Sequence, residues 1–444
     1  MQLKIKTSLR FLGGLLVWAL PAVAGDAWTL ERALDYALAN SPDAKLARQR
    51  VIAAQAGLEQ ANAVFWPRLQ FQSSYTRTDN PMMVFGSILN QRAYPSGGLD
   101  FNDVPDVDNL NTKGLVTVPL YAGGRNKAGR AAAQANTEAA RQETEAVRNA
   151  LAFQVSRAFY TVLKTRQFIR ATEGAVVSFD SNLSVARKHL QGGTLLKTDV
   201  LDLEVRSAQA RENLVRARNA NALAVRALRN LLGIEEGNFL VADSAPAVAA
   251  PDSGDFSRRA ELAAAHQHER AAQEQVRGAK AGYLPRVNAF GSLDYNYGWK
   301  FESGGRSYTV GALLQWDLWD GKLTRAKVRE ADANLESARE EQRKLRLALD
   351  LEVEQARLNL TEANERLDVT DQTLAQASES ASLTRARFEQ GAALSTQLID
   401  SETALVTTRV RRAEAEADQQ IAIGALRKAL ALPQLDSKSN SESK

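Results

Sequence analysis

The chain of 444 residues contains no cysteine, which excludes disulfides, thiolate metal sites, a catalytic thiol and a lipid-modified N-terminal cysteine. After residue 24 it has no apolar run of about 18 residues, so we expect no transmembrane helix. It also lacks a basic block there. The net charge of +4 falls to about +1 without Lys4, Lys6 and Arg10, and nucleic acid is therefore not an expected partner.

The first 24 residues are typical of a secretory signal peptide. Lys4, Lys6 and Arg10 form a basic start, FLGGLLVWAL is apolar, and Ala22 to Ala24 are small residues suited to cleavage. A retained membrane anchor is the alternative, although this apolar run is short for a spanning segment. We therefore expect residues 1–24 to be removed on export.

Proline is absent from two long spans, 120–245 and 286–432, which are rich in Ala, Leu, Glu, Arg and Gln. These residues lose least conformational freedom in a helix, and apolar positions recur there at spacings of three and four. The pattern predicts long amphipathic helices, which we place at about 29–64, 124–191, 198–232, 256–282, 322–389 and 396–432.

The sequence repeats itself at a constant offset of 198 residues. GTLLKTDVLD (193–202) matches GAALSTQLID (391–400), and ALRNLLGI (227–234) matches ALRKALAL (425–432). A fixed offset over so long a span indicates one structural unit used twice. We assign the first repeat to 25–234, a linker to 235–255 with a possible short strand at NFLVA, the second repeat to 256–432, and a disordered polar tail to 433–444.

Each repeat contains a strand–loop–strand segment, at about 68–120 and 286–319. Apolar side chains alternate with others along the second strand of each segment, as in Val116, Val118 and Leu120, and in Tyr308, Val310 and later residues. This favours lipid-facing strands, with a soluble hairpin buried on one face as the alternative. The first repeat has about 20 more residues here, in 78–111, whose Pro, Gly, Asn and Asp content predicts a long exposed loop.

The doubled strand–loop–strand–long-helix unit, the LYAGGR and LWDGKL passages from strand to helix, and the glycine-to-aspartate turns together resemble the outer-membrane efflux protein (TolC) family. The resemblance covers nearly the whole chain after residue 24. It implies a mainly α fold with a membrane β-barrel portion. Long helical hairpins would form a trimeric periplasmic α-barrel tunnel, and each chain would give four strands to one shared outer-membrane β-barrel.

The resemblance also implies a function. The chain would be a passive exit duct in the outer membrane, part of a tripartite efflux or type I secretion system. Its partners would be two further copies of itself, outer-membrane lipid, a periplasmic adaptor protein, and an inner-membrane pump or ABC transporter. Members of the family carry drugs, metal ions or polypeptides.

The same resemblance places two kinds of site residue at the repeated turns. Adaptor-facing helix tips would contain Gly193, Leu195, Gly391 and Leu394. The constriction of the periplasmic mouth would involve Asp400, Asp199, Asp202, Gln397 and Phe388. From the residues alone, the three aspartates could equally favour the starts of the return helices, where carboxylates suit the helix dipole.

The charge partner of Asp199 is an open question at this stage. The arginine that usually pairs with it in the family corresponds to Ala393 here, and Phe388 stands where the family has an aromatic hydroxyl. Arg385, Arg387 or Lys197 could take the place of that partner.

Nothing in the sequence requires an enzyme, a catalytic residue or a cofactor. His266 and His268 lie two apart on a predicted helix and so point in different directions, which makes a poor metal chelate. The Gly-Gly pairs lack the context of a phosphate-binding loop. A different class of protein, a periplasmic helical scaffold that never enters the membrane, is the alternative function.

Overall fold

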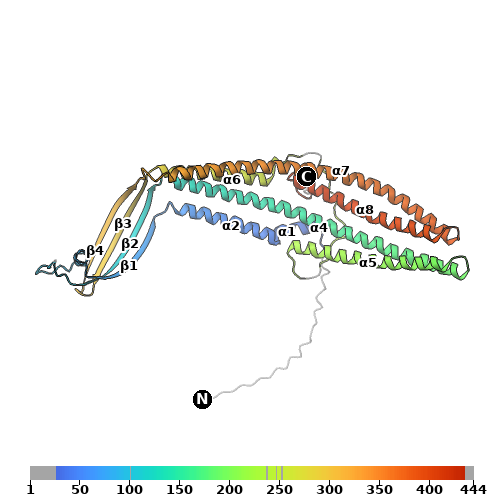
Figure 1. Cartoon of the computed structure of the whole chain (residues 1–444), viewed down its shortest axis with the longest axis horizontal. Coiled ribbons are helices and arrows are strands. Elements are labelled where there is room, and N and C mark those ends of the chain that lie inside the picture. Colours follow the sequence, from blue (N-terminus) through green and yellow to red (C-terminus); the bar gives the residue numbers. More distant parts are fainter. Residues whose placement is uncertain (1–26, 101, 237–238, 247, 252–253, 436–444) are drawn as a thin grey trace, which may run out of the picture.

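The computed structural model describes residues 27–100, 102–236, 239–246, 248–251 and 254–435. The predicted signal peptide and the last nine residues of the predicted tail lie outside the described residues. The molecule is elongated, with a β-sheet at one end and long helices that run from it to two helical tips (Figure 1). The mainly helical fold class and the four strands are as predicted.

The four strands form one antiparallel sheet in the order β1-β2-β3-β4, with β1 Arg68–Thr78, β2 Val107–Tyr121, β3 Arg286–Gly298 and β4 Ser303–Gln315. The register places Leu69 opposite Val116, Leu293 opposite Tyr308, and Gly291 opposite Val310. Since side chains alternate along a strand, one face of the sheet is apolar and exposed, as predicted.

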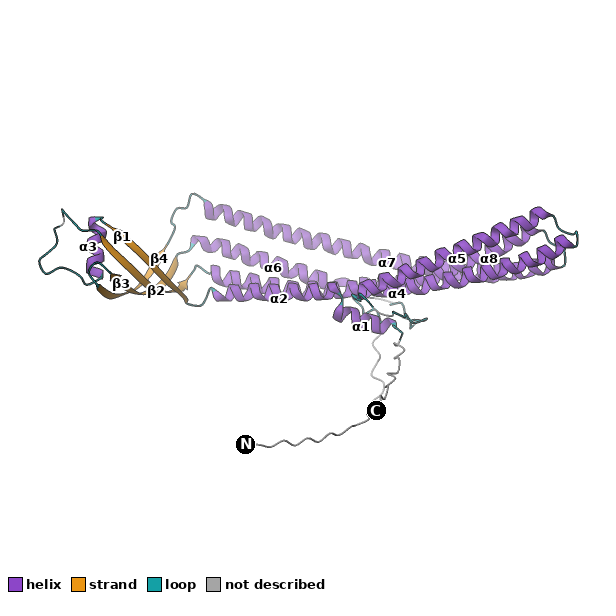
Figure 2. Ribbon diagram, turned by 90° about the horizontal axis from the view of Figure 1, so that it is seen from below, coloured by secondary structure: helices purple, strands orange, loops and turns teal. Residues whose placement is uncertain are grey.

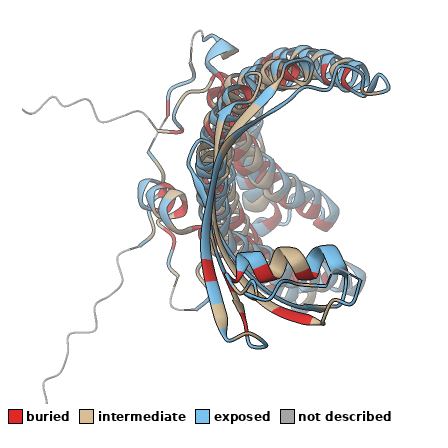
Figure 3. Cartoon of the chain, turned by 90° about the vertical axis from the view of Figure 1, so that its left-hand side faces the viewer, coloured by how far each residue is buried: buried red, intermediate tan, exposed pale blue. Residues whose placement is uncertain are grey.

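The opposite face of the sheet is polar. Asn109 and Asn111 each donate an amide N–H to Oδ1 of Asn296, at 2.9 and 3.0 Å. Figure 3 shows that the sheet is strongly curved. A sheet with one apolar and one polar face is suited to separating lipid from water.

In the first repeat, α4 Arg125–Gln191 has 67 residues and is therefore about 100 Å long. The return helix α5 Lys197–Leu232 packs on one half of it, and α2 Pro42–Ala63 packs on the other. The helix predicted at 29–64 is in fact two. It is interrupted at Ser41, whose hydroxyl caps α2 by accepting from Ala44 N, and α1 is Leu30–Asn40.

The second repeat has the same plan. α7 Leu323–Glu389 also has 67 residues, and it packs on α6 Ala260–Lys280 and α8 Ser395–Ala429. Short 3-10 turns flank α6 at Phe256–Arg258 and Ala281–Tyr283. α4 contacts both α6 and α8, so the two repeats join side by side in one layer, which Figure 3 shows to be curved.

The linker crosses the helices near their middle. In the expected strand at NFLVA, Val241 makes a single parallel bridge to Trp28. Both residues belong to a core cluster with α1 and the centre of α4, which includes Leu30, Leu151 and Phe159. At the start of the predicted tail, Gln434 is buried and its amide donates to Gly424 O at 3.0 Å, so the chain is packed as far as Leu435.

One prediction about the sheet end is wrong. The segment 78–111 is not simply an exposed loop, because it contains α3 Pro81–Asn90, capped by the side chain of Asn80. Val84 and Ile88 of this helix are buried against Val107 of β2. The composition concealed the helix because Pro81 and Asn80, which suggest a loop, serve here as its first residue and its cap.

Candidate functional site at the helix tips

The two helix tips share one backbone geometry. Gly193 and Gly391 have left-handed φ angles of 75° and 73°. After each glycine, the next N–H donates back to a carbonyl near the helix end, from Thr194 to His189 O at 2.9 Å and from Ala392 to Arg387 O at 2.7 Å. Glycine is favoured here because other residues rarely adopt this conformation.

The return helices also begin in the same way. Leu196 and Leu394 are the N-cap residues, and their N–H groups donate to side chains one turn later, to Asp199 Oδ2 at 3.3 Å and to Gln397 Oε1 at 3.2 Å. Asp199 and Gln397 are therefore structural equivalents that satisfy a helix-start N–H. The sequence left two roles open for Asp199, a helix cap or a charge at the mouth, and the cap is present in this structure.

The exposed leucines at the tips are Leu196 and Leu394, which expose 70% and 66% of their surface. The predicted tip residue Leu195 is half-buried against the core at the helix ends, and its equivalent in the second repeat is Ala393. The sequence offset of 198 already pairs Leu196 with Leu394, so this correction was available from the repeat itself.

Asp199 joins the two tips. Its Oδ1 accepts a hydrogen bond of 2.5 Å from the hydroxyl of Ser395, the buried first residue of α8. None of the three basic side chains considered for this acid is its partner. Arg385 pairs elsewhere, Arg387 donates to Ala392 O at 3.4 Å, and Lys197 is exposed.

The remaining predicted mouth residues separate into two groups. Asp202 and Asp400 are structural equivalents, both exposed, and no hydrogen bond or ion pair holds either within the described part of the chain. Phe388, in contrast, is buried between the hairpins with its ring edge-on to His189 at 5.9 Å. The ring of Phe388 is part of the core in this chain, and its place in the constriction of an assembled mouth stays a prediction.

A buried charged cluster that the sequence did not predict lies close to the tips. Glu402 of α8 is 1% exposed, and its carboxylate accepts from Arg385 of α7 at 2.5 Å and from the Ser178 hydroxyl of α4 at 2.8 Å. Asn182 of α4 also donates to it, at 3.3 Å. The cluster thus connects the first hairpin to the second.

A weak sequence signal for this cluster existed. Glu402 falls four residues after Leu398 and three before Leu405, so it occupies the apolar face of its helix. A charged residue on such a face needs a buried partner. The sequence could not identify Ser178 as a partner, because it lies 224 residues away in the other repeat.

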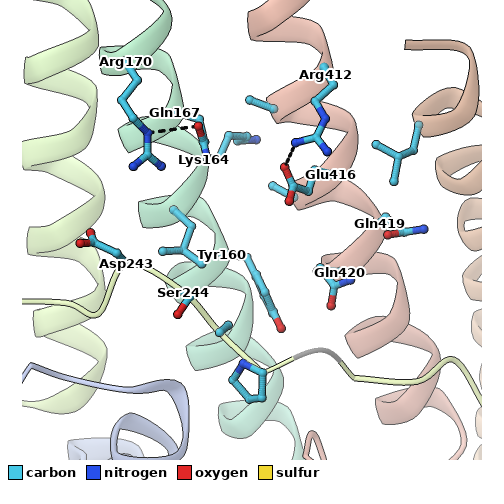
Figure 4. Close-up of a pocket in the computed structure, with 16 residues that line it drawn as sticks. Tyr160, Lys164, Gln167, Arg170, Asp243, Ser244, Arg412, Glu416, Gln419 and Gln420 are labelled. Carbon is cyan, nitrogen blue, oxygen red and sulfur yellow. Dashed lines mark hydrogen bonds and ion pairs between the residues drawn. The ribbon is translucent and has the colours of Figure 1, made fainter. Parts of the chain in front are cut away.

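A separate cavity of about 350 Å³ lies where the linker crosses between α4 and α8 (Figure 4). Tyr160 and Gln420 line it, and the hydroxyl of one and the amide oxygen of the other have no hydrogen-bond partner among the described residues. Burial raises the pKa of the Tyr160 hydroxyl. This cavity lies near the middle of the helices, away from the tips.

Within the described residues, no helix combines the length and apolarity needed to cross a bilayer. His268 lies near Glu143 on α4, with Nε2 and Oε1 2.8 Å apart. In the same part of the chain, no three His, Asp or Glu side chains come together as a metal site would require.

Comparison with known proteins gives consistent results. A family model described as "Outer membrane efflux protein" matches residues 33–234 and 256–432. Outer membrane protein TolC of Vibrio cholerae is 31% identical over 149 residues, which are 34% of this chain and 33% of that protein. Outer membrane protein OprJ of Pseudomonas aeruginosa is 25% identical over 311 residues, 67% of this chain and 63% of that protein.

The matched parts therefore span about a third and somewhat under two thirds of these two relatives. Among solved structures, the outer membrane protein VceC of Vibrio cholerae has a TM-score of 0.76 at 19% identity. That comparison covers 91% of this chain and 96% of VceC, and it shows that the fold is shared.

Proposed function

Because this chain belongs to the outer membrane efflux protein family, we propose that it is the passive outer-membrane exit duct of a tripartite efflux or type I secretion system. It is a channel protein and not an enzyme. Energy for transport would come from an inner-membrane pump or ABC transporter, connected to this chain through a periplasmic adaptor. The sheet would lie in the outer membrane and the helices in the periplasm.

The sheet supports assembly from several copies. β1 and β4 each have one edge without a partner strand in the described chain. Unpaired backbone groups in lipid cost several kcal/mol each, and four strands cannot close around a pore. Three chains, the number in the family, would supply three times four strands and close a twelve-stranded barrel, with the apolar face towards lipid.

The helices support the same arrangement. α7 lies at one side of the curved layer, packed mainly on α6 and α8. Its outer face exposes a row of apolar side chains: Leu347, Leu351, Leu358, Val369 and Leu383. The opposite side of the layer exposes a second row on α5, formed by Leu201, Val205, Val215 and Leu223, and the neighbouring α2 exposes Leu46 and Ile52. The two rows could pack against each other between neighbouring copies.

The tips would face the adaptor and form the periplasmic mouth. Leu196 and Leu394 offer an exposed apolar contact at the end of each hairpin. Three copies would place Asp202 and Asp400 in rings of three carboxylates, and such rings attract cations. Asp199 and Gln397 serve instead as helix caps, so their contribution to a charged ring is smaller.

The observation that carries this proposal is the four-stranded sheet with a lipid-type face and two open edges, joined to paired long hairpins. Its test is fractionation followed by mass measurement. The protein should stay in the outer-membrane fraction after a high-salt wash and have about three times the chain mass in detergent. A protein released by salt, or a stable monomer with native strand content, would instead support the periplasmic scaffold.

A further inference from the structure

Helix α3 is docked on the polar face of the sheet, at the end furthest from the helical tips (Figure 2). Gln91, directly after this helix, donates its amide to Asp108 O at 2.7 Å and to Asn109 Oδ1 at 3.0 Å. Asn109 belongs to the polar face of β2, because it bonds Asn296 across the sheet. Figure 3 accordingly shows a short helix on the concave side of the curved sheet.

The sheet is shaped to receive this segment. A Cβ atom on Gly298 would lie 2.3 Å from Oε1 of Gln91, and one on Gly305 would lie 2.0 Å from the main-chain oxygen of Asn90. Larger residues at these two positions would displace the segment. Ser303 adds a hydrogen bond of 2.8 Å to Gln91 O, and Gln91 itself is 0% exposed.

The helix is apolar on its free side as well as on its docked side. Its sequence, PMMVFGSILN, contains no charged residue. Val84 and Ile88 face the sheet, whereas Met82, Met83 and Leu89 are exposed. An apolar helix exposed to solvent on the polar face of a sheet is unexpected unless it contacts another apolar surface.

The proposed three-chain barrel would supply that surface. Strands about 4.8 Å apart and tilted by about 40° give a twelve-stranded barrel a radius of about 12 Å. A helix with its side chains is about 10 Å thick. Three such helices, lying across the inner wall, would leave an aperture of only a few ångströms on the axis. No charge on α3 would oppose their approach.

We propose that α3 is an apolar outlet gate. One copy from each chain meets the other two inside the outer end of the barrel, through Met82, Met83 and Leu89. Narrow apolar constrictions exclude water and therefore ions. The inference rests on the proposed three-chain channel, and it adds a second constriction at the opposite end from the carboxylate rings of the mouth.

The test uses the absence of cysteine in the native chain. Gln72 lies on β1 opposite Lys113, on the polar face. In whole cells, Gln72→Cys would be treated from outside with 2-sulfonatoethyl methanethiosulfonate, which does not cross membranes. The expected labelling is at least tenfold slower than that of Ser96→Cys, which lies in the exposed loop after α3.

Opening the gate should let the reagent reach the cysteine at position 72 and so speed its labelling. Two backgrounds would be compared, one with Met82, Met83 and Leu89 all changed to Asn, and one with Gly305→Leu, which displaces the docked segment. Each should raise the labelling rate of Gln72→Cys about tenfold. Equal rates for Gln72→Cys and Ser96→Cys in the native background, or no increase in both opened backgrounds, would overturn the gate.

The mass of each purified variant in detergent separates the gate from the channel. A trimer whose labelling contradicts the expectation refutes the gate and leaves the proposed function intact. A native chain that forms no trimer refutes the proposed function, and the gate with it.

Discussion

Replacing Glu402 with glutamine should loosen the connection between the two hairpins. The side chain keeps its shape but loses the charge that Arg385 and Ser178 contact. Breaking a fully buried ion pair from one side costs about 3–5 kcal/mol, whereas exposed pairs contribute about 0–1 kcal/mol. Glu402 is 1% exposed but the side chain of Arg385 is 36% exposed, so water recovers part of the loss, and we expect about 2 kcal/mol per chain.

In a chain of this length, about 1 kcal/mol corresponds to a shift of roughly 1–2 °C in Tm. Circular dichroism melting of the detergent-solubilised protein should therefore show a fall of about 2–4 °C for Glu402→Gln. The control is Glu416→Gln on the same helix, which removes a pair with Arg412 whose side chains are 47% and 35% exposed; because water reaches both groups, Tm should fall by less than for Glu402→Gln. A Glu402→Gln protein that melts with the native one would refute the argument.

A double replacement tests the physical cause. Changing both Arg385 and Glu402 to leucine removes the whole pair, so neither charge is left buried and alone. This variant should be more stable than Glu402→Gln, because apolar replacement of both partners is often nearly neutral.

Since the cluster joins α4 to α7 and α8 close to the tips, Glu402→Gln should also raise single-channel conductance. A lower Tm with native conductance would show that the cluster stabilises the fold but does not limit the channel.

Three further predictions concern the tips and the first hairpin. Asp400→Ala should reduce cation selectivity and divalent-cation block in single-channel recordings with little loss of Tm; a lower Tm with native selectivity would identify a structural role. The double substitution Leu196→Glu and Leu394→Glu, which places a charge at each exposed tip, should abolish export while the trimer persists. Export at the native level in this variant would contradict the proposed contact with the adaptor. Hydrogen bonds from Ser207 and Arg211 lower the pKa of the Asp180 carboxyl. The ionised Asp180 carboxylate should therefore stabilise the folded protein fully above the unfolded pKa of about 4, and this contribution should be lost as pH falls through the lower pKa of the folded state. The difference in Tm between the native and Asp180→Asn proteins should accordingly shrink on acidification.

Local pattern was sufficient for most of the secondary structure. The prediction of 124–191 agrees with α4 at Arg125–Gln191, and 322–389 agrees with α7 at Leu323–Glu389. These helices are long, free of proline and periodic, so each turn reinforces the next. The repeat was equally informative, because both tips and both helix starts have the same geometry 198 residues apart.

The candidate site was predicted less well. The sequence placed the turns correctly, but burial decides which side chain at a turn is exposed. Leu195 and Phe388 proved to belong to the core between the hairpins, and Asp199 to a helix cap with a link to Ser395. These outcomes depend on α4 meeting α8, a contact between repeats that local periodicity cannot specify.

The sequence by itself determined that this chain is a twice-used unit of strands and long helical hairpins, because helix and strand periodicity, proline placement and turn glycines act over a few neighbouring residues. Only the tertiary structure decided where Glu402 finds Arg385 and Ser178, and where α3 rests on the sheet. The Ser178 hydroxyl lies 224 residues from Glu402, and the two glycines that leave room for α3 lie on β3 and β4, so local patterns could specify neither contact.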